Sequence, residues 1–164
     1  MNIIRVLLTS AIVLANQAIA GDAREIDHLK GATEKSAIEF VDGFYHEVRE
    51  GMSRSDLQYY FSSDENKILD LSIIIMSEWS NKATEIETQH FMDLMNIEAR
   101  CESLELESMS LSGMYTKYAR LNYKVTNICT ETINPNKREV KLEYPGTTKR
   151  WIIESIQAKV ANDE

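Results

Sequence analysis

Two pairs of side chains have the spacing of metal ligands on a helix. Glu25 with His28 and Glu87 with His90 each place a carboxylate and an imidazole three residues apart. Two such pairs on facing helices can hold a di-metal centre. The first pair precedes the first patterned segment, however, and the second half of the chain has the pattern of a sheet. The sequence therefore favours solvated helix surfaces over a metal site, and it predicts no cofactor.

Cys101 and Cys129 are the only cysteines. Such a pair can be a redox couple, two buried thiols or a structural disulfide. Redox couples usually have a C-x-x-C spacing, which is absent here. No Ser-His-Asp arrangement, glycine-rich phosphate loop or basic aromatic patch can be identified either.

The N-terminus has the order of a secretory signal. A positive start, MNIIR, precedes the apolar run VLLTSAIVLA and the small-residue motif Ala18-Ile19-Ala20. The run is short for a membrane span, which needs about 20 residues. We expect cleavage after Ala20 and a periplasmic or secreted protein without a stable membrane anchor. Because that compartment is oxidising, the two cysteines are predicted to form one disulfide.

The length of the chain limits the number of domains, and its net charge limits the classes of partner. Residues 1–20 are expected to be the signal peptide, 21–31 a flexible mature N-terminus, 32–160 a single α+β domain and 161–164 a C-terminal tail. The formal net charge of −8 disfavours nucleic acid and favours basic partners.

The spacing of apolar residues predicts four helical segments in the first half. A repeat of three and four predicts an amphipathic helix over 32–50. Shorter helical signals cover 55–62 and 84–95. Between them, 64–79 is so rich in isoleucine and leucine that it predicts a central, buried helix, with a buried strand as the alternative.

After Asn96 the period of the apolar residues changes from 3.6 to 2, which predicts strands. The alternating residues are Leu104 and Leu106, then Leu121, Tyr123 and Val125, then Val140, Leu142 and Tyr144, followed by a last strand from Trp151 to Ala158. Consecutive strands joined by turns predict a curved four-stranded antiparallel sheet with the N-terminal helices packed on one face.

The register of the first hairpin provides a check on the disulfide. Pairing Leu104 with Val125 and Leu106 with Tyr123 matches apolar to apolar side chains. The same register sets Cys101 opposite Ile128, one residue from Cys129. A small bulge there would bring the sulfur atoms into range.

This order of elements resembles the nuclear-transport-factor-like superfamily, the cone-shaped α+β fold that ketosteroid isomerases and polyketide cyclases share. The resemblance rests on the helical first half, the strand meander and a last strand that begins Lys149-Arg150-Trp151-Ile152-Ile153. Members of this superfamily often dimerise through the sheet, so the resemblance implies a homodimer of that kind. It does not imply one activity, because the fold carries many functions.

In the enzymes of that fold a carboxylate base faces a tyrosine inside the cone. The resemblance makes Asp42 and Tyr45 the candidate pair of a small isomerase or dehydratase that abstracts a proton. Trp79, Tyr123 and Tyr45 are the candidates for lining a ligand pocket.

The absence of any chemical motif favours a different function over catalysis. The leading hypothesis is an exported, non-catalytic binding or accessory domain. Its partner would be a basic protein, such as a toxin or an envelope component, bound at an acidic sheet face, or a small apolar ligand in the cone.

Overall fold

The computed structural model describes residues 29–130 and 136–160. The expected signal peptide, most of the 21–31 segment and the 161–164 tail lie outside the described residues. Among the helices that are described, none combines the length and the apolar character that a membrane crossing requires.

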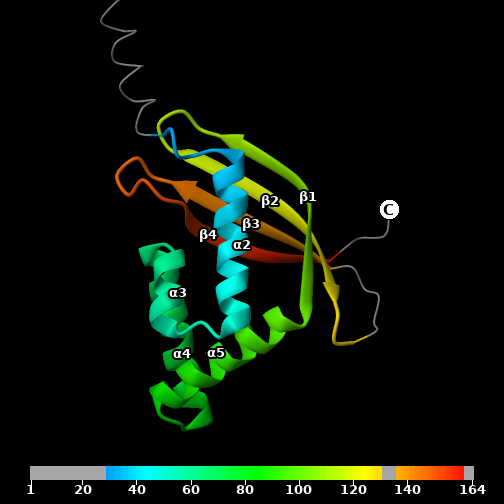
Figure 1. The fold of residues 1–164 in the computed structure, drawn as a ribbon. Coiled ribbons are helices and arrows are strands. Elements are labelled where there is room, and N and C mark those ends of the chain that lie inside the picture. Colours follow the sequence, from blue (N-terminus) through cyan, green and yellow to red (C-terminus); the bar gives the residue numbers. More distant parts are fainter. Residues whose placement is uncertain (1–28, 131–135, 161–164) are drawn as a thin grey trace, which may run out of the picture.

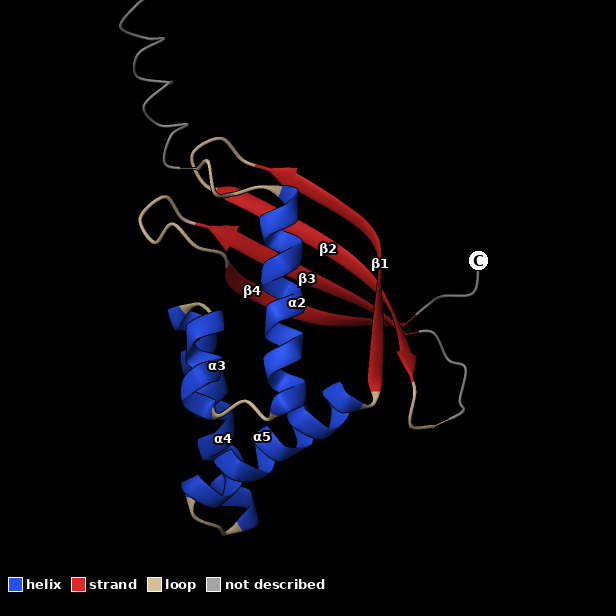
Figure 2. Ribbon diagram, in the orientation of Figure 1, coloured by secondary structure: helices blue, strands red, loops and turns tan. Residues whose placement is uncertain are grey.

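The described chain is an α+β fold with helices first and strands second, as predicted (Figure 1). The helices are α2 (Glu34–Glu50), α3 (Arg54–Tyr60), α4 (Ser63–Ser80) and α5 (Thr84–Arg100). The strands are β1 (Glu102–Ser112), β2 (Lys117–Asn127), β3 (Asn136–Tyr144) and β4 (Ile152–Val160). They form one antiparallel sheet in the order β1-β2-β3-β4, which curves around α2 (Figure 2).

Helix α2 supplies the helical side of the core. Its buried residues Ala37, Val41, Phe44, Tyr45 and Val48 recur at three and four, which places them on one face. That face packs against the inward side of the sheet, where Leu121, Val140, Leu142 and Ile153 are fully buried. The predicted amphipathic helix over 32–50 is thus confirmed.

Serine side chains set the starts of the next two helices. Ser53 caps α3 by accepting a hydrogen bond from the Asp56 N–H, and Ser62 caps α4 by accepting one from the Glu65 N–H. Each helix begins one residue earlier than the sequence pattern predicts, because Ser53 and Ser62 satisfy free N–H groups of the first turn.

Helix α4 has the predicted conformation but not the predicted position. It is a helix rather than a strand, but it is not central: only Ile73 and Ser77 are buried, and it packs mainly against α5. Its composition correctly indicated an apolar segment. Composition alone does not show which elements pack against the apolar side chains, and most of these side chains are exposed to solvent.

The first hairpin has the predicted register. Leu104 pairs with Val125 and Leu106 with Tyr123, while the bulge lies further along, between Leu106 and Ser108. The Cys101 carbonyl accepts a hydrogen bond from the Ile128 N–H at 2.7 Å, so Cys101 does lie opposite Ile128.

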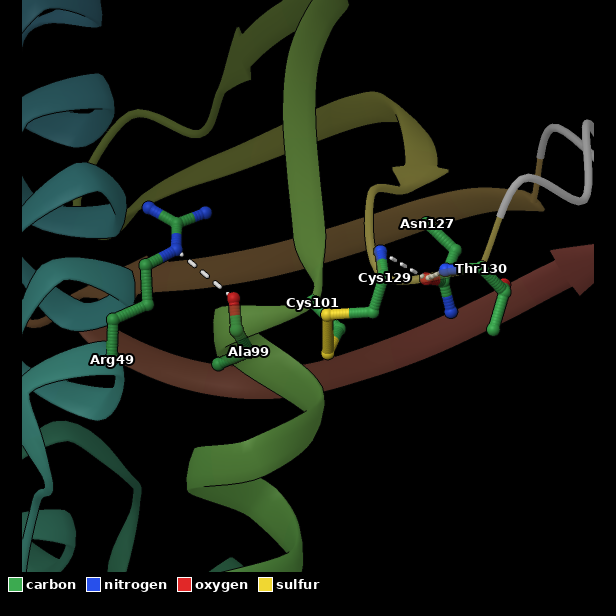
Figure 3. The surroundings of a disulfide bond; sticks show 6 residues. All are labelled: Arg49, Ala99, Cys101, Asn127, Cys129 and Thr130. Atoms are coloured by element: carbon green, nitrogen blue, oxygen red, sulfur yellow. Dashed lines mark hydrogen bonds between the residues drawn. A yellow bond between two sulfur atoms is a disulfide. The ribbon is translucent and has the colours of Figure 1, made fainter.

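A disulfide joins Cys101 to Cys129, with Cα atoms 5.0 Å apart. Cys101 ends α5, whereas Cys129 lies in the turn that follows β2 (Figure 3). A turn, rather than a bulge, brings the sulfur atoms together: the Asn127 Oδ1 accepts hydrogen bonds from the N–H groups of Cys129 and Thr130. The predicted pairing is confirmed.

Candidate ligand-binding cavity

A cavity of about 280 Å³ lies between α2, α5 and the inward side of the sheet. Its walls are mainly apolar and include Phe44, Val48, Phe61, Met95, Ala99 and Ile156. Helix α2 contributes its wall because Phe44, Tyr45 and Val48 share the buried face. The polar groups of the lining come from Tyr45, Glu98, Glu102 and Arg138.

Arg138 and Glu102 form an ion pair in this wall. The Arg138 Nη2 donates to the Glu102 Oε1 at 2.8 Å, and the Nη1 donates to the Oε2, so the pair is bidentate. Each side chain is only 18% exposed. Burial alone would lower the pKa of Arg138, but the hydrogen bond to Glu102 opposes this and the pKa is raised. The guanidinium therefore stays charged and hydrogen-bonded to Glu102.

Tyr45 is buried, and its hydroxyl has no hydrogen-bond partner among the described residues. The Arg138 guanidinium carbon lies 6.0 Å from the centre of the Tyr45 ring. Burial raises the pKa of Tyr45, and the Arg138 guanidinium partly offsets the effect through its charge and its hydrogen-bonding approach to the phenol oxygen, although no bond of normal geometry forms. The phenol is thus neutral at physiological pH and retains a proton to donate.

Asp42 and Tyr45, the candidate pair, have different surroundings in the structure. Tyr45 lines the cavity, whereas Asp42 is exposed and does not. Asp42 acts on a different tyrosine: burial raises the pKa of Tyr123, and the charge of Asp42 raises it further.

The other two pocket candidates lie outside the lining. Tyr123 is buried in the core, and its hydroxyl also lacks a partner among the described residues. Trp79 is 85% exposed in the last turn of α4 and does not line this cavity. An aromatic residue in an apolar segment was a reasonable candidate for the cone, but α4 does not reach it.

Sequence reasoning missed Glu102 and Arg138. Arg138 pairs with Tyr123 in the sheet, so it alternates with Val140, Leu142 and Tyr144 on the inward face. A charged residue in phase with an apolar stripe was a signal that could have identified it.

The carboxylate and imidazole pairs do not assemble a metal site in the described chain. Glu25 and His28 lie outside the described residues. Glu87 is buried and accepts a hydrogen bond from the Ser80 hydroxyl at 2.7 Å. Across residues 29–130 and 136–160, no cluster of three or more histidine, cysteine, aspartate or glutamate side chains could hold a metal ion.

The outward face of the sheet carries a cluster of mixed charge instead of the expected acidic face. Glu139 is 4% exposed. Lys159 contacts its carboxylate at 2.7 Å, and Arg120 and Lys141 each lie 3.7 Å away. Three cations around one carboxylate leave this part of the sheet locally positive.

Replacing Glu139 with glutamine should make the free energy of unfolding less dependent on pH in the acid range. The hydrogen bond from Lys159 lowers the pKa of Glu139 although burial opposes it. A carboxylate with a lowered folded pKa stabilises the fold above its unfolded pKa of about 4.3, and the contribution is lost as pH falls through the folded value. Glu139→Gln should therefore lower the free energy of unfolding by about 1–2 kcal/mol at pH 7 and by much less near pH 3.

Urea unfolding at the two pH values measures this difference. Glu143→Gln is the matched control, since Glu143 pairs with Tyr118 on the same outward face and should give small changes at both pH values. A Glu139→Gln effect of equal size at pH 7 and pH 3 would contradict a lowered pKa of Glu139 in the folded protein.

Comparison with protein-family models, with curated proteins and with solved structures gives no match for this chain.

Proposed function

We propose that this protein is an exported, non-catalytic binding domain whose cavity takes a small apolar ligand with one hydrogen-bond acceptor. One observation carries the proposal: Tyr45, whose buried hydroxyl has no hydrogen-bond partner among the described residues, lines a cavity with apolar walls. A buried hydroxyl without a partner costs about 1–3 kcal/mol. An acceptor on a ligand would recover that cost, while the walls would bind its apolar body.

The size and lining of the cavity agree with this chemistry. Ligand sites are mostly apolar with a few polar groups that fix orientation, and they start at about 300 Å³. A cavity of about 280 Å³ suits a small ring or a short chain. Arg138 already donates to Glu102, so the Tyr45 hydroxyl is the donor of this wall that has no partner among the described residues.

The disulfide supports export, because such bonds persist in oxidising compartments. The helices packed on a curved meander likewise support our proposal that the chain is a member of the nuclear-transport-factor-like superfamily. Neither observation identifies the ligand, so the cavity itself has to be tested.

Acetophenone and ethylbenzene form a matched probe pair, because they have similar shapes and differ in a carbonyl oxygen. We expect both to bind, and acetophenone to bind about 5- to 30-fold more tightly through the Tyr45 hydroxyl, as one hydrogen bond allows. Tyr45→Phe should remove the preference and leave ethylbenzene affinity unchanged. Chemical-shift titration of the backbone amides measures both affinities and locates the site.

Two control variants distinguish binding in the cavity from binding at the surface. Ala99→Met fills the cavity and should weaken both probes. Tyr59→Phe removes the hydroxyl of an exposed tyrosine and should change neither affinity. No binding of either probe, or a preference that survives in Tyr45→Phe, would overturn the proposal.

The catalytic alternative, an isomerase or dehydratase, has less support from the geometry. Proton abstraction needs a carboxylate that is free to face Tyr45. Both oxygens of Glu102 accept from Arg138, and Asp42 lies outside the lining. Glu98 does line the cavity, but its side chain is exposed.

The same probe distinguishes catalysis from binding. Acetophenone has acidic methyl protons, so a base in the cavity would accelerate their exchange in D₂O. We expect no acceleration by the protein. Exchange that is accelerated, and that slows in Glu98→Gln or Asp42→Asn, would establish the enzymatic function instead.

A further inference from the structure

Helix α4 presents a row of apolar side chains to solvent. Ile68, Leu71, Ile75 and Trp79 are 59%, 57%, 38% and 85% exposed, respectively. Spacings of three and four place them on one face, opposite Ile73 and Ser77, which are buried. We call these four residues the α4 stripe. Ile74 and Met76, which are also exposed, flank it.

The α4 stripe lies where a second molecule can reach it. Helices α4 and α5 form a hairpin at the end of the molecule away from the turn between β1 and β2 (Figure 2). Since α4 packs mainly against α5, no other described element covers the stripe.

The α4 stripe is a contiguous exposed apolar surface. Its four side chains are 38–85% exposed, and spacings of three and four make them neighbours along the helix. Contiguous apolar surfaces with polar residues beside them mark interaction sites on proteins.

Charges beside the stripe complement those of a second copy. Lys67 and Glu78 lie eleven residues apart, close to three helical turns, so they flank the same side of the stripe at its opposite ends. Two α4 helices packed antiparallel about an axis between Ser72 and Ile73 would place each Lys67 against Glu78 of the second copy. In the single chain Lys67 contacts only Asp64, at an exposed i, i+3 pair.

We propose that the α4 stripe is the interface of a two-fold symmetric homodimer in which the two α4 helices run antiparallel. The four residues of the stripe are uncharged, so two chains of net charge −8 can meet there without bringing like charges into contact. An anionic membrane would be repelled by that same net charge. This dimer differs from one through the sheet, whose outward face carries the charged cluster around Glu139.

Sedimentation equilibrium of the disulfide-bonded chain tests the proposal. We expect a dimer, and we expect Ile75→Lys to raise its dissociation constant at least 100-fold. A lysine reduces the net negative charge, so general repulsion cannot explain the loss. Ile128→Lys is the matched control, since Ile128 is 64% exposed and lies in the turn after β2; it should leave the dissociation constant unchanged.

Charge reversal tests the antiparallel arrangement. Lys67→Glu and Glu78→Lys should each raise the dissociation constant about 3- to 10-fold at low salt. The double variant Lys67→Glu/Glu78→Lys should restore it. Circular dichroism confirms that each variant is folded.

Several outcomes would overturn the proposal. They are a monomer at all concentrations, a dimer that Ile75→Lys leaves intact, and a dimer that is lost in Arg120→Glu on the outward face of the sheet. A monomer that cosediments with phosphatidylcholine vesicles would assign the stripe to a membrane. None of these results depends on the proposed ligand, since α4 does not line its cavity.

Discussion

Replacing both cysteines with serine should lower the free energy of unfolding by about 3–4 kcal/mol. The bond links residues separated by 28 positions, and closing a loop of that length in the unfolded chain accounts for this value. The denatured variant should also be more expanded, so the dependence of unfolding on denaturant should become steeper. Guanidinium unfolding followed by circular dichroism measures both quantities.

Reduction of the wild-type protein provides the control. A thiol reductant should shift the wild type to the stability of Cys101→Ser/Cys129→Ser and leave that variant unchanged. The region has other contacts that will persist. The Arg49 Nε donates to the Ala99 carbonyl at 3.0 Å (Figure 3), and the Arg100 Nε donates to the Arg49 carbonyl at 2.7 Å. A loss below about 1 kcal/mol would mean that these contacts alone hold the junction of α5 and β1.

The arrangement of the hairpin could be predicted because two independent constraints agree. Apolar alternation fixes the pairing of Leu104 with Val125, and only that register brings the two cysteines close enough to bond. A shift of one residue would turn the apolar side chains to the wrong face. Local sequence patterns therefore suffice to predict the pairing of a strand when one face of it is buried and the other is exposed to solvent.

The position of α4 could not be predicted for the opposite reason. Its apolar residues occupy almost every side of the helix, so the pattern shows no preferred face. Ile73 packs inward while Ile75, two residues later, is 38% exposed. Composition reports how apolar a helix is, but the neighbour that covers it depends on tertiary or quaternary contacts.

The candidate site was predicted only in part. The periodicity of α2 predicts that Tyr45 is buried, and the resemblance to the nuclear-transport-factor-like superfamily made it a candidate for the site. The phase of Arg138 with the apolar residues of β3 could have marked it as inward-facing, but its pairing with Glu102 could not be predicted, because β1 and β3 are separated in the sheet by β2. A contact that crosses an intervening strand has no signature in the spacing of the sequence.

Replacing Arg138 with methionine should destabilise the fold by about 3–5 kcal/mol, because it leaves the Glu102 carboxylate mostly buried without its partner. Methionine keeps most of the side-chain volume, so a cavity does not explain the loss. Urea unfolding at pH 7 measures the free energy.

The double variant Arg138→Met/Glu102→Met determines what the ion pair contributes. If the cost in Arg138→Met comes from the stranded carboxylate, removing that carboxylate should restore stability to within about 1 kcal/mol of the wild type. The ion pair would then orient the polar wall of the cavity rather than stabilise the fold. Should the double variant remain as unstable as Arg138→Met, the guanidinium itself would be the stabilising group. Its contact with the ring of Tyr45 is then the interaction to test next.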